Sequence, residues 1–313
     1  MTLVQAKGLC KQFGDFVAVD HVSFDVAKGE VAGFLGPNGA GKSTTMKMLT
    51  GFLPPDAGSA MIHGLDVATD PVLAKSKLGY LPEGAPAYGD MSVAAYLGFV
   101  GRLRGLSAAV LRERLAEMVE RVKLEEVWNR RIENLSKGFA RRVGIAQALI
   151  HDPEVLILDE PTDGLDPNQK HQMRMLIRQI AAEKAIIIST HILEEVEAIC
   201  SRAIIIADGV IVADKTPEEL MQRNSEYRQV QIVVAAGHAD LAADLLQAAA
   251  QVEQVQLLER RGELTRMMVH SSDTLFAPAH VLGLLADKRV TVHEVGVYKT
   301  SLEDVFREIT RVN

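Results

Sequence analysis

The sequence predicts an α/β protein whose first two-thirds is built on a mainly parallel sheet and whose remainder is a small α+β domain. Three observations lead to this prediction. A glycine-rich loop near residue 40 stands between a strand-like and a helical segment. Two continuous apolar runs, EVLILDE and AIIIST, flank a helical segment, as parallel strands buried on both faces do. From about residue 221, strands and helices follow in the order βαββαβ.

The segments around the glycine-rich loop predict an antiparallel β subdomain. TLVQAKGLC and VAVDHVSFDV alternate between apolar and polar residues, and AKGE forms a tight turn into the strand VAGFLG. The loop then leads into a helix that carries Met46, Met48 and Leu49. Two short strand-like pieces, SAMIHG and KLGYLPE, follow between turns rich in glycine and proline.

A helical insertion is expected at about residues 90–150. Its apolar residues are spaced for one buried face: Leu111, Leu115, Met118 and Val122. The apolar strands follow, and AIIIADGVIVAD closes the region as a hairpin around Asp208-Gly209. We therefore predict one domain over residues 1–220, with the helical insertion as its subdomain.

The polar stretch PEELMQRNSEY predicts a linker to a second domain over residues 221–313. The order βαββαβ is that of the ferredoxin-like arrangement. The segment contains no catalytic constellation, so we interpret it as an accessory docking or dimerisation domain.

Composition narrows the class of protein. Apolar residues make up 48% of the 313 residues and charged residues 24%, which is ordinary for a globular protein. With 34 basic against 41 acidic residues the net charge is -7, which disfavours a nucleic-acid partner. No apolar run reaches the roughly 18 residues of a membrane span, and the N-terminus does not have the layout of a signal peptide. We therefore expect a soluble cytoplasmic protein.

The pattern of cysteines and histidines predicts no zinc site. Cys10 and Cys200 stand alone, without a Cys-x-x-Cys partner. No pair among the nine histidines has the helical spacing of metal ligands with an acid nearby. Reduced cysteines in the cytosol are the expected state.

The segment GPNGAGKST matches the phosphate-loop pattern G-x-x-x-x-G-K-[ST] between a strand and a helix. Its glycines let backbone N–H groups turn inward around an anion, with the positive end of the helix behind them. Lys42 would reach the β- and γ-phosphates of ATP, and the Ser43 hydroxyl would take one place on Mg²⁺. The predicted ATP-binding residues are Gly36, Pro37, Asn38, Gly39, Ala40, Gly41, Lys42, Ser43 and Thr44.

Two acids end the apolar run EVLILDE, at the edge where open α/β sheets bind ligands. Asp159 is expected to contact Mg²⁺, through water. Glu160 is expected to point elsewhere and to polarise the water that attacks the γ-phosphate. His191 follows the run AIIIST at the same edge, and it would hydrogen-bond the γ-phosphate or orient the water of Glu160.

Four segments, GPNGAGKST, LSKGFARRV, LILDEPTDGLDP and STH, resemble the ATP-binding cassette (ABC) ATPases in order and spacing, over about residues 1–220. In that family each ATP lies between the phosphate loop of one nucleotide domain and the signature turn of another. The resemblance implies a partner that is a second copy or a related ATPase. Ser136 would begin a helix whose N–H groups face the partner's γ-phosphate. The implied signature residues are Leu135, Ser136, Lys137, Gly138 and Phe139, and the implied dimer loop is Gly164, Leu165 and Asp166.

Further positions carry over from the same resemblance. Phe13 corresponds to the aromatic residue that stacks on adenine, with a core aromatic as the other interpretation. Glu83 stands where the family usually has a catalytic Gln that contacts Mg²⁺ and water, and an ionised acid there can only accept hydrogen bonds. The signature usually reads Leu-Ser-Gly-Gly-Gln, so Lys137 adds a charge and Phe139 removes an amide. These departures, and the ending TSLEDVF, resemble the branch of ABC-2 type exporters, which includes drug-export, sodium-export and gliding-motility-associated ATPases.

Three functions stay open from the sequence. The leading one is the ATP-hydrolysing subunit of an ABC-2 type exporter, held at the cytoplasmic face of the membrane by an integral membrane permease. The segment GAPAYGDMSV, which includes Pro86, and the helical insertion would then form a groove for a short permease helix. The alternative is a soluble mechanochemical ABC ATPase, although the chain shows neither a second cassette nor a long coiled coil. The third, an ATP-binding regulator with little hydrolysis, is disfavoured by the intact acids and histidine.

Overall fold

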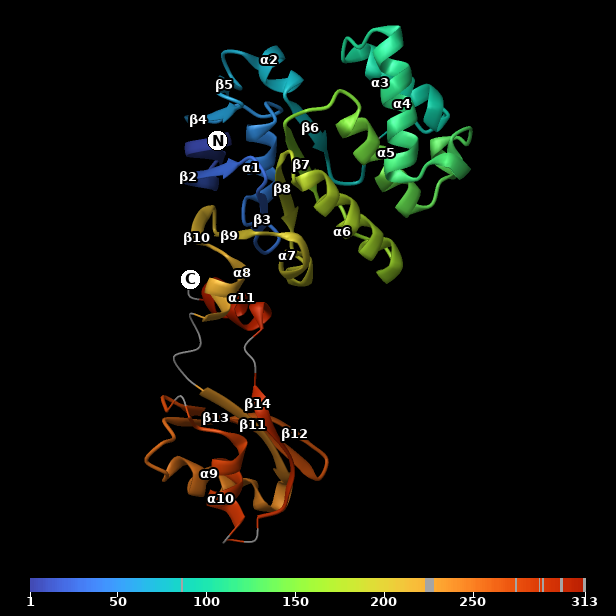
Figure 1. Ribbon diagram of the computed structural model, residues 1–313. Helices are drawn as coiled ribbons and strands as arrows, with labels where there is room; N and C mark the ends of the chain where they lie inside the picture. The colour runs from blue at the N-terminus through green and yellow to red at the C-terminus, as the bar shows by residue number, and fades with distance from the viewer. Residues whose placement is uncertain are drawn as a thin grey trace. The chain divides into compact units, whose positions relative to one another are not determined.

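The computed structural model describes residues 1–85, 87–222, 228–273, 275–286, 288, 290–298 and 301–311. Pro86 lies outside this range. The chain divides into two compact units, one formed by Met1–Pro217 with Glu308–Asn313 and the other by Glu218–Arg307 (Figure 1).

The stretch expected to be a linker begins instead as a helix, α8 (Pro217–Gln222). Proline suits the first helical position, and Glu218 and Glu219 in the first turn favour the positive end of the helix. Leu220 is fully buried, so this part of the stretch is packed structure. The rest of it, residues 223–227, lies outside the described residues.

A six-stranded sheet forms the centre of the first unit. Its order is β10-β9-β3-β8-β7-β6, and all neighbours are parallel except the β9–β10 hairpin. That hairpin turns at Asp208 and Gly209, where φ is 47° and 81°, as the sequence predicts for a tight turn. The strands are β3 (Val31–Leu35), β6 (Leu78–Leu81), β7 (Val155–Asp159), β8 (Ala185–Thr190), β9 (Arg202–Ala207) and β10 (Val210–Lys215).

Both faces of this sheet are covered, which explains the unbroken apolar runs. On β7, Leu156 and Leu158 belong to a core shared with the helical insertion, whereas Val155 and Ile157 belong to a core shared with the antiparallel sheet. The expectation of strands buried on both faces is confirmed. The helices of this unit are α1 (Lys42–Leu49), α2 (Pro71–Ser76), α3 (Val93–Leu103), α4 (Ala108–Val122), α5 (Lys137–Leu149), α6 (Pro167–Ala181) and α7 (Leu193–Ile199), with 3₁₀ turns at Glu125–Val127 and Ile132–Asn134.

The antiparallel subdomain is a second sheet in the order β2-β1-β4-β5. Figure 1 shows it beside α1, while α3 and α4 lie on the other side of the central sheet. Its long strands alternate because one face packs on the core and the other meets solvent. The strands are β1 (Thr2–Phe13), β2 (Phe16–Ala27), β4 (Ala57–Ile62) and β5 (Leu65–Asp66).

The second unit has the predicted ferredoxin-like fold. Its sheet runs in the order β12-β13-β11-β14, with every neighbouring pair antiparallel. On β11, Val230, Ile232 and Val234 are buried against α9 and α10, which lie on one face of the sheet (Figure 1). The elements are β11 (Arg228–Ala235), a 3₁₀ turn (Ala236–His238), α9 (Ala239–Gln247), β12 (Gln254–Arg261), β13 (Leu264–Ser271), α10 (Pro278–Ala286) and β14 (Val292–Tyr298), followed by α11 (Leu302–Arg311), which spans the division between the units.

His151, just after α5, lies in a largely buried and basic setting. Its Nε2 lies 3.1 Å from the Leu78 carbonyl oxygen, so Nε2 carries the proton, and its buried Nδ1 has no partner. Burial, aided by the nearby charge of Arg104, lowers the pKa of His151 to about 4. A proton on Nδ1 would therefore be buried without an acceptor.

This setting predicts a loss of stability in mild acid. The unfolded chain protonates His151 near pH 6.5, whereas the folded chain does so near pH 4, so its contribution is present above pH 6.5 and is lost as the pH falls. We expect this residue alone to lower the free energy of unfolding by about 2 kcal/mol between pH 7 and pH 5. Urea unfolding at both pH values should show a smaller decline for His151→Gln, which keeps a donor for Leu78. An equal decline in the variant would contradict this assignment.

Candidate active site

One cleft of about 350 Å³ collects most of the predicted site residues. The phosphate loop follows β3, His191 follows β8, Glu160 follows β7 and Glu83 follows β6. Because β3, β8, β7 and β6 are successive neighbours in the sheet, their carboxyl ends meet at one edge. The cleft is lined by Phe13, Phe16, Ala18, Asn38, Gly39, Gly41, Lys42, Ser43, Thr44, Glu83, Glu160, Asp163 and His191.

The phosphate loop needs its glycines for space as well as for backbone conformation. At Gly41 φ is 104°, and a Cβ there would lie 2.5 Å from the Ala18 carbonyl oxygen. A Cβ on Gly36 would lie 2.4 Å from the Ile206 carbonyl oxygen. Side chains at either position would push the loop off the strands that support it. The helix α1 begins at Lys42, directly behind the loop.

Lys42 lies folded back inside this loop. Its Nζ donates to the carbonyl oxygens of Gly36, at 2.7 Å, and Pro37, at 3.1 Å. Burial lowers the pKa of Lys42, while the charges of Glu160, Asp159 and Glu83 act in the opposite direction. The loop thus holds an ammonium group on carbonyl oxygens, which are weaker partners than phosphate oxygens.

Asp159 ends β7 and is 2% exposed, just behind the cleft residues. It pairs in register with Ser189 of β8, whose hydroxyl donates to the Asp159 carboxylate. Burial raises the pKa of Asp159, the Ser189 hydrogen bond lowers it, and the charge of Glu83 raises it. A cation here would relieve that cost, and the oxygen donors of Asp159, Ser43 and Glu83 are the kind that Mg²⁺ prefers.

Glu160 is held in an unusual backbone conformation with φ at 48°, and its N–H donates to the Ser189 carbonyl oxygen at 3.0 Å. This turns the Glu160 side chain away from that of Asp159 and toward His191. The Nδ1 of His191 lies 2.9 Å from Oε1 of Glu160, while the buried Oε2 of Glu160 has no partner. The structure therefore presents one carboxylate oxygen oriented by a histidine and one buried oxygen whose hydrogen-bonding capacity is unused.

The far wall of the cleft is aromatic. Phe13 and Phe16 face each other in register at the tip of the β1–β2 hairpin and are 50% and 59% exposed. The Lys11 ammonium lies 5.8 Å from the centre of the Phe13 ring. Exposed rings at a cleft wall suit stacking on a planar base, whereas a core aromatic would be buried. Phe13 is therefore not a core residue.

Sequence reasoning missed three residues of the cleft: Phe16, Ala18 and Asp163. Phe16 could have been found from the hairpin FGDF, which brings Phe16 opposite Phe13. Ala18 lies in the cleft because its backbone is next to Gly41, and the sequence does not reveal a contact between segments so far apart. Four of the residues predicted for the phosphate and Mg²⁺ sites, Gly36, Pro37, Ala40 and Asp159, do not line the cleft. Gly36, Ala40 and Asp159 are buried, whereas Pro37 is exposed.

Comparison with known proteins agrees with this geometry. A family model described as "ABC transporter" matches residues 19–163. The "Nod factor export ATP-binding protein I" of Cupriavidus metallidurans is 34% identical over 309 residues, covering 98% of this chain and 97% of that protein. The chain belongs to the ABC transporter ATP-binding proteins.

Two further ABC proteins show how far the likeness reaches. A protein of Escherichia coli named as a probable multidrug ABC transporter ATP-binding protein, YbhF, is 36% identical over 229 residues. That match covers 73% of this chain but spans only 39% of YbhF. A solved structure of an ATP-binding subunit of an ABC transporter has a TM-score of 0.66 at 30% identity, and covers 71% of this chain and 93% of its own.

The segment expected to be the signature turn lies outside the cleft. Among the described residues that line the cleft, none belongs to the segment 135–139. Ser136 is exposed and caps α5, since its hydroxyl accepts the Phe139 N–H at 3.4 Å. Phe139 is half-buried, and the Arg142 guanidinium lies 5.8 Å from its ring centre. This chain therefore presents a helix start that its own phosphate loop does not face.

The signature turn and the expected dimer loop form one surface. A Cβ added at Gly138 would lie 2.7 Å from the Gln169 side chain, and one at Gly164 would lie 3.4 Å from the Lys137 side chain. Asp166 caps α6 by accepting the Gln169 N–H at 2.9 Å. Leu165 points inward and is 7% exposed in the core.

Among the described residues, no helix combines the length and apolar character needed to cross a membrane.

Proposed function

We propose that the chain binds Mg²⁺-ATP in this cleft and hydrolyses it as the ATP-binding subunit of an ABC-2 type exporter. One observation carries the proposal. The phosphate loop, Glu160 and His191 converge in one cleft from neighbouring strand ends, while none of the described residues that line this cleft belongs to the signature turn. A site that is complete for phosphate and water, but lacks the signature turn, requires a second subunit.

The residues divide the chemistry between them. Lys42 and the loop N–H groups bind the β- and γ-phosphates, and Ser43, Asp159 and Glu83 hold Mg²⁺, which neutralises phosphate charge when bound. Glu160 accepts the proton of the attacking water with its carboxylate. His191 fixes the orientation of Glu160 through the 2.9 Å contact. Phe13 and Phe16 stack on the base.

The nucleotide holds two subunits together. Ser136 begins α5, and its hydroxyl proton remains free to donate to the γ-phosphate bound by the partner while its oxygen caps the helix. The positive end of α5 adds to the attraction. Loss of the γ-phosphate removes the bridging group, so hydrolysis releases the interface. The partner is a second copy or a related ATPase.

A groove of about 930 Å³ between α2 and α3 suits a helix of the permease. Tyr88, from the segment after Glu83, lies with its ring centre 5.9 Å from Phe99 on α3. Phe52, Val72 and Leu103 are 72%, 79% and 74% exposed along the same groove. Aromatic rings exposed together mark an interaction site. Relatives named for Nod factor export and multidrug transport favour a membrane partner.

The location and the second unit follow from the same proposal. The chain acts at the cytoplasmic face of the membrane through its permease, without a nucleic-acid partner. We propose residues 1–220 as the nucleotide-binding domain, with residues 90–150 as its helical subdomain, and residues 221–313 as the accessory domain. Truncation after Leu220 is a poor test of this division, because it also removes residues 308–311 of the first unit.

The test is co-purification from solubilised membranes in the presence of ATP. We expect tagged Glu160→Gln protein to bring down a stoichiometric polytopic membrane protein, and the further double change Phe99→Glu, Leu103→Glu to lose it. In the background with Glu160 intact, the same double change should leave ATP hydrolysis by the isolated protein unchanged. Met175→Glu, at an exposed position of α6, is the matched control and should keep the partner. Recovery of ribosomes or nucleic-acid enzymes instead would support a soluble mechanochemical ATPase.

A further inference from the structure

A bulge in the antiparallel sheet gathers three metal-ligating side chains outside the nucleotide cleft. Leu9 pairs with Val22, but Lys11 pairs with Val19, so the single residue Cys10 faces two residues of β2. Those two residues are Asp20 and His21. A bulge of this kind re-aims side chains that a regular ladder would send to opposite faces.

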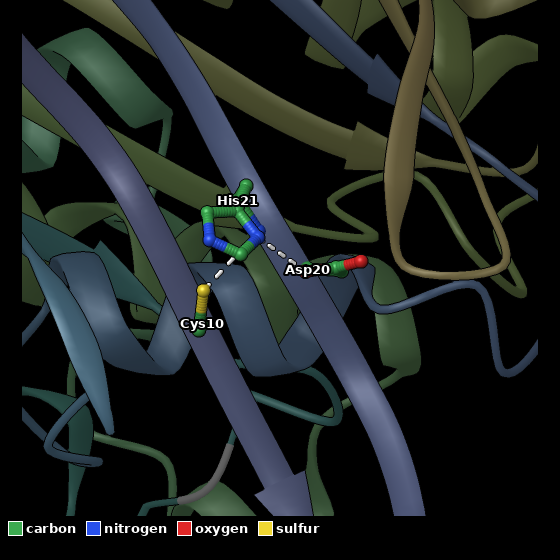
Figure 2. Close-up of side chains that lie close together, drawn as sticks. All are labelled: Cys10, Asp20 and His21. Atoms are coloured by element: carbon green, nitrogen blue, oxygen red, sulfur yellow. Dashed lines mark hydrogen bonds and ion pairs between the residues drawn. The ribbon is translucent and has the colours of Figure 1, made fainter.

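The donor atoms of Cys10, Asp20 and His21 all lie within 4.8 Å of one another (Figure 2). His21 Nδ1 is 2.5 Å from Asp20 Oδ1, so the imidazole and the carboxylate point toward one another. The backbone N–H of His21 donates to the Cys10 sulfur at 3.3 Å, and the Cys10 sulfur lies 3.5 Å from the Gly8 carbonyl oxygen. These contacts fix the position of the sulfur opposite Asp20 and His21.

The backbone at this point is held in a rarely adopted conformation. His21 has φ at 49°, in the left-handed region that β-strands avoid, close to the φ of 48° at Glu160 in the nucleotide cleft. Outliers of this kind cluster at functional sites, because surrounding structure must hold them. At His21 the conformation brings the imidazole back toward Asp20 and over Cys10.

We propose that Cys10, Asp20 and His21 bind one Zn²⁺ ion, with water as the fourth ligand. A thiolate, an imidazole and a carboxylate are the donors that zinc prefers, and three protein ligands with one open position are an established zinc geometry. The side chains of His21 and Asp20 are 81% and 50% exposed, so the ion and the water reach the site from solvent. Donors around zinc lie about 3.3 to 3.8 Å apart. Rotation of the exposed His21 and Asp20 side chains closes the remaining distance.

Binding replaces protons by the metal. The Cys10 thiol loses its proton to solvent, and so does the pair formed by His21 and Asp20. The ion would link β1 to β2 close to the base-binding end of the cleft, because the cleft residues Phe13 and Ala18 lie on the same two strands, between Cys10 and Asp20 in the sequence. The proposed zinc would link the two strands of that hairpin while keeping one position open to solvent, and its site is distinct from the Mg²⁺ position at the sheet edge.

Thiol labelling of the full chain tests the proposal. Burial raises the pKa of Cys200 to about 12, so at neutral pH iodoacetamide reports on Cys10. In metal-stripped protein we expect added Zn²⁺ to slow Cys10 alkylation about tenfold or more. Co²⁺ should give a sulfur-to-metal charge-transfer band. Cys10→Ser should abolish that band, and Cys200→Ser, the matched control, should keep it.

His21→Gly separates zinc binding from folding. Glycine favours a φ of 49°, so this variant should keep the fold while removing the imidazole. We expect Zn²⁺ no longer to protect Cys10 in His21→Gly, and protection to weaken about tenfold or more in Asp20→Asn. Equal protection in His21→Gly and in the parent, or alkylation of the parent that Zn²⁺ does not slow, would overturn the proposal.

Discussion

Replacement of Glu160 by Gln is expected to lower ATP hydrolysis by about 10²- to 10⁴-fold while leaving ATP binding intact. Gln keeps the size of the side chain and can accept from His191, but it cannot take the proton of the attacking water. The phosphate loop is untouched, so the nucleotide still binds. Steady-state phosphate release measures the loss, and light scattering with ATP should show a dimer that persists.

The matched control for this change is Glu183→Gln, the same chemical replacement at an exposed position between α6 and β8. It should hydrolyse ATP like the parent. Two results would count against the proposed role: hydrolysis retained in Glu160→Gln, or a Glu160→Gln protein that stays monomeric with ATP while the parent is active.

Replacement of Lys42 by Ala should weaken ATP binding roughly 10- to 100-fold, since a hydrogen bond to a charged group contributes about 1.5–3 kcal/mol. Hydrolysis should fall further, on the order of 10²-fold or more, because the ammonium also stabilises charge on the γ-phosphate in the transition state. Fluorescent ATP-analogue binding and phosphate release separate the two effects.

Lys47→Ala is the comparison for Lys42→Ala, because both residues lie on α1 but Lys47 is exposed and does not line the cleft. Near-parental binding and hydrolysis are expected for Lys47→Ala. Undiminished hydrolysis by the Lys42→Ala variant would mean that the phosphate site lies elsewhere.

The cleft could be anticipated because its parts are local in sequence. The loop GPNGAGKST carries its own glycines and lysine, and each apolar strand ends directly in its polar residue. Parallel neighbours then place Lys42, Glu160 and His191 at one edge without further information. The roles of these residues stay predictions. The structure adds the orientation of Glu160, which depends on a backbone angle that the sequence does not reveal.

Other features depend on register and burial that the residue pattern hides. Histidine spacing along the sequence cannot reveal the cluster around His21, because a cross-strand cluster has no fixed spacing and requires the bulge opposite Cys10. The polar character of PEEL predicts a linker, but its proline and two acids are also typical of the first turn of a helix. In the structure this segment begins α8, whose Leu220 is buried. Polarity alone therefore misplaces the beginning of a short amphipathic helix.

The division of the chain into units also sets an order of events during synthesis. Residues 218–307 are contiguous, so the second unit has all of its parts once that segment has left the ribosome. Most of the first unit is synthesised before the second unit, but residues 308–311, which also belong to the first unit, are synthesised after it. Contacts between segments so far apart are slow to form. The ATP-binding unit therefore completes its fold only after the smaller unit has been made.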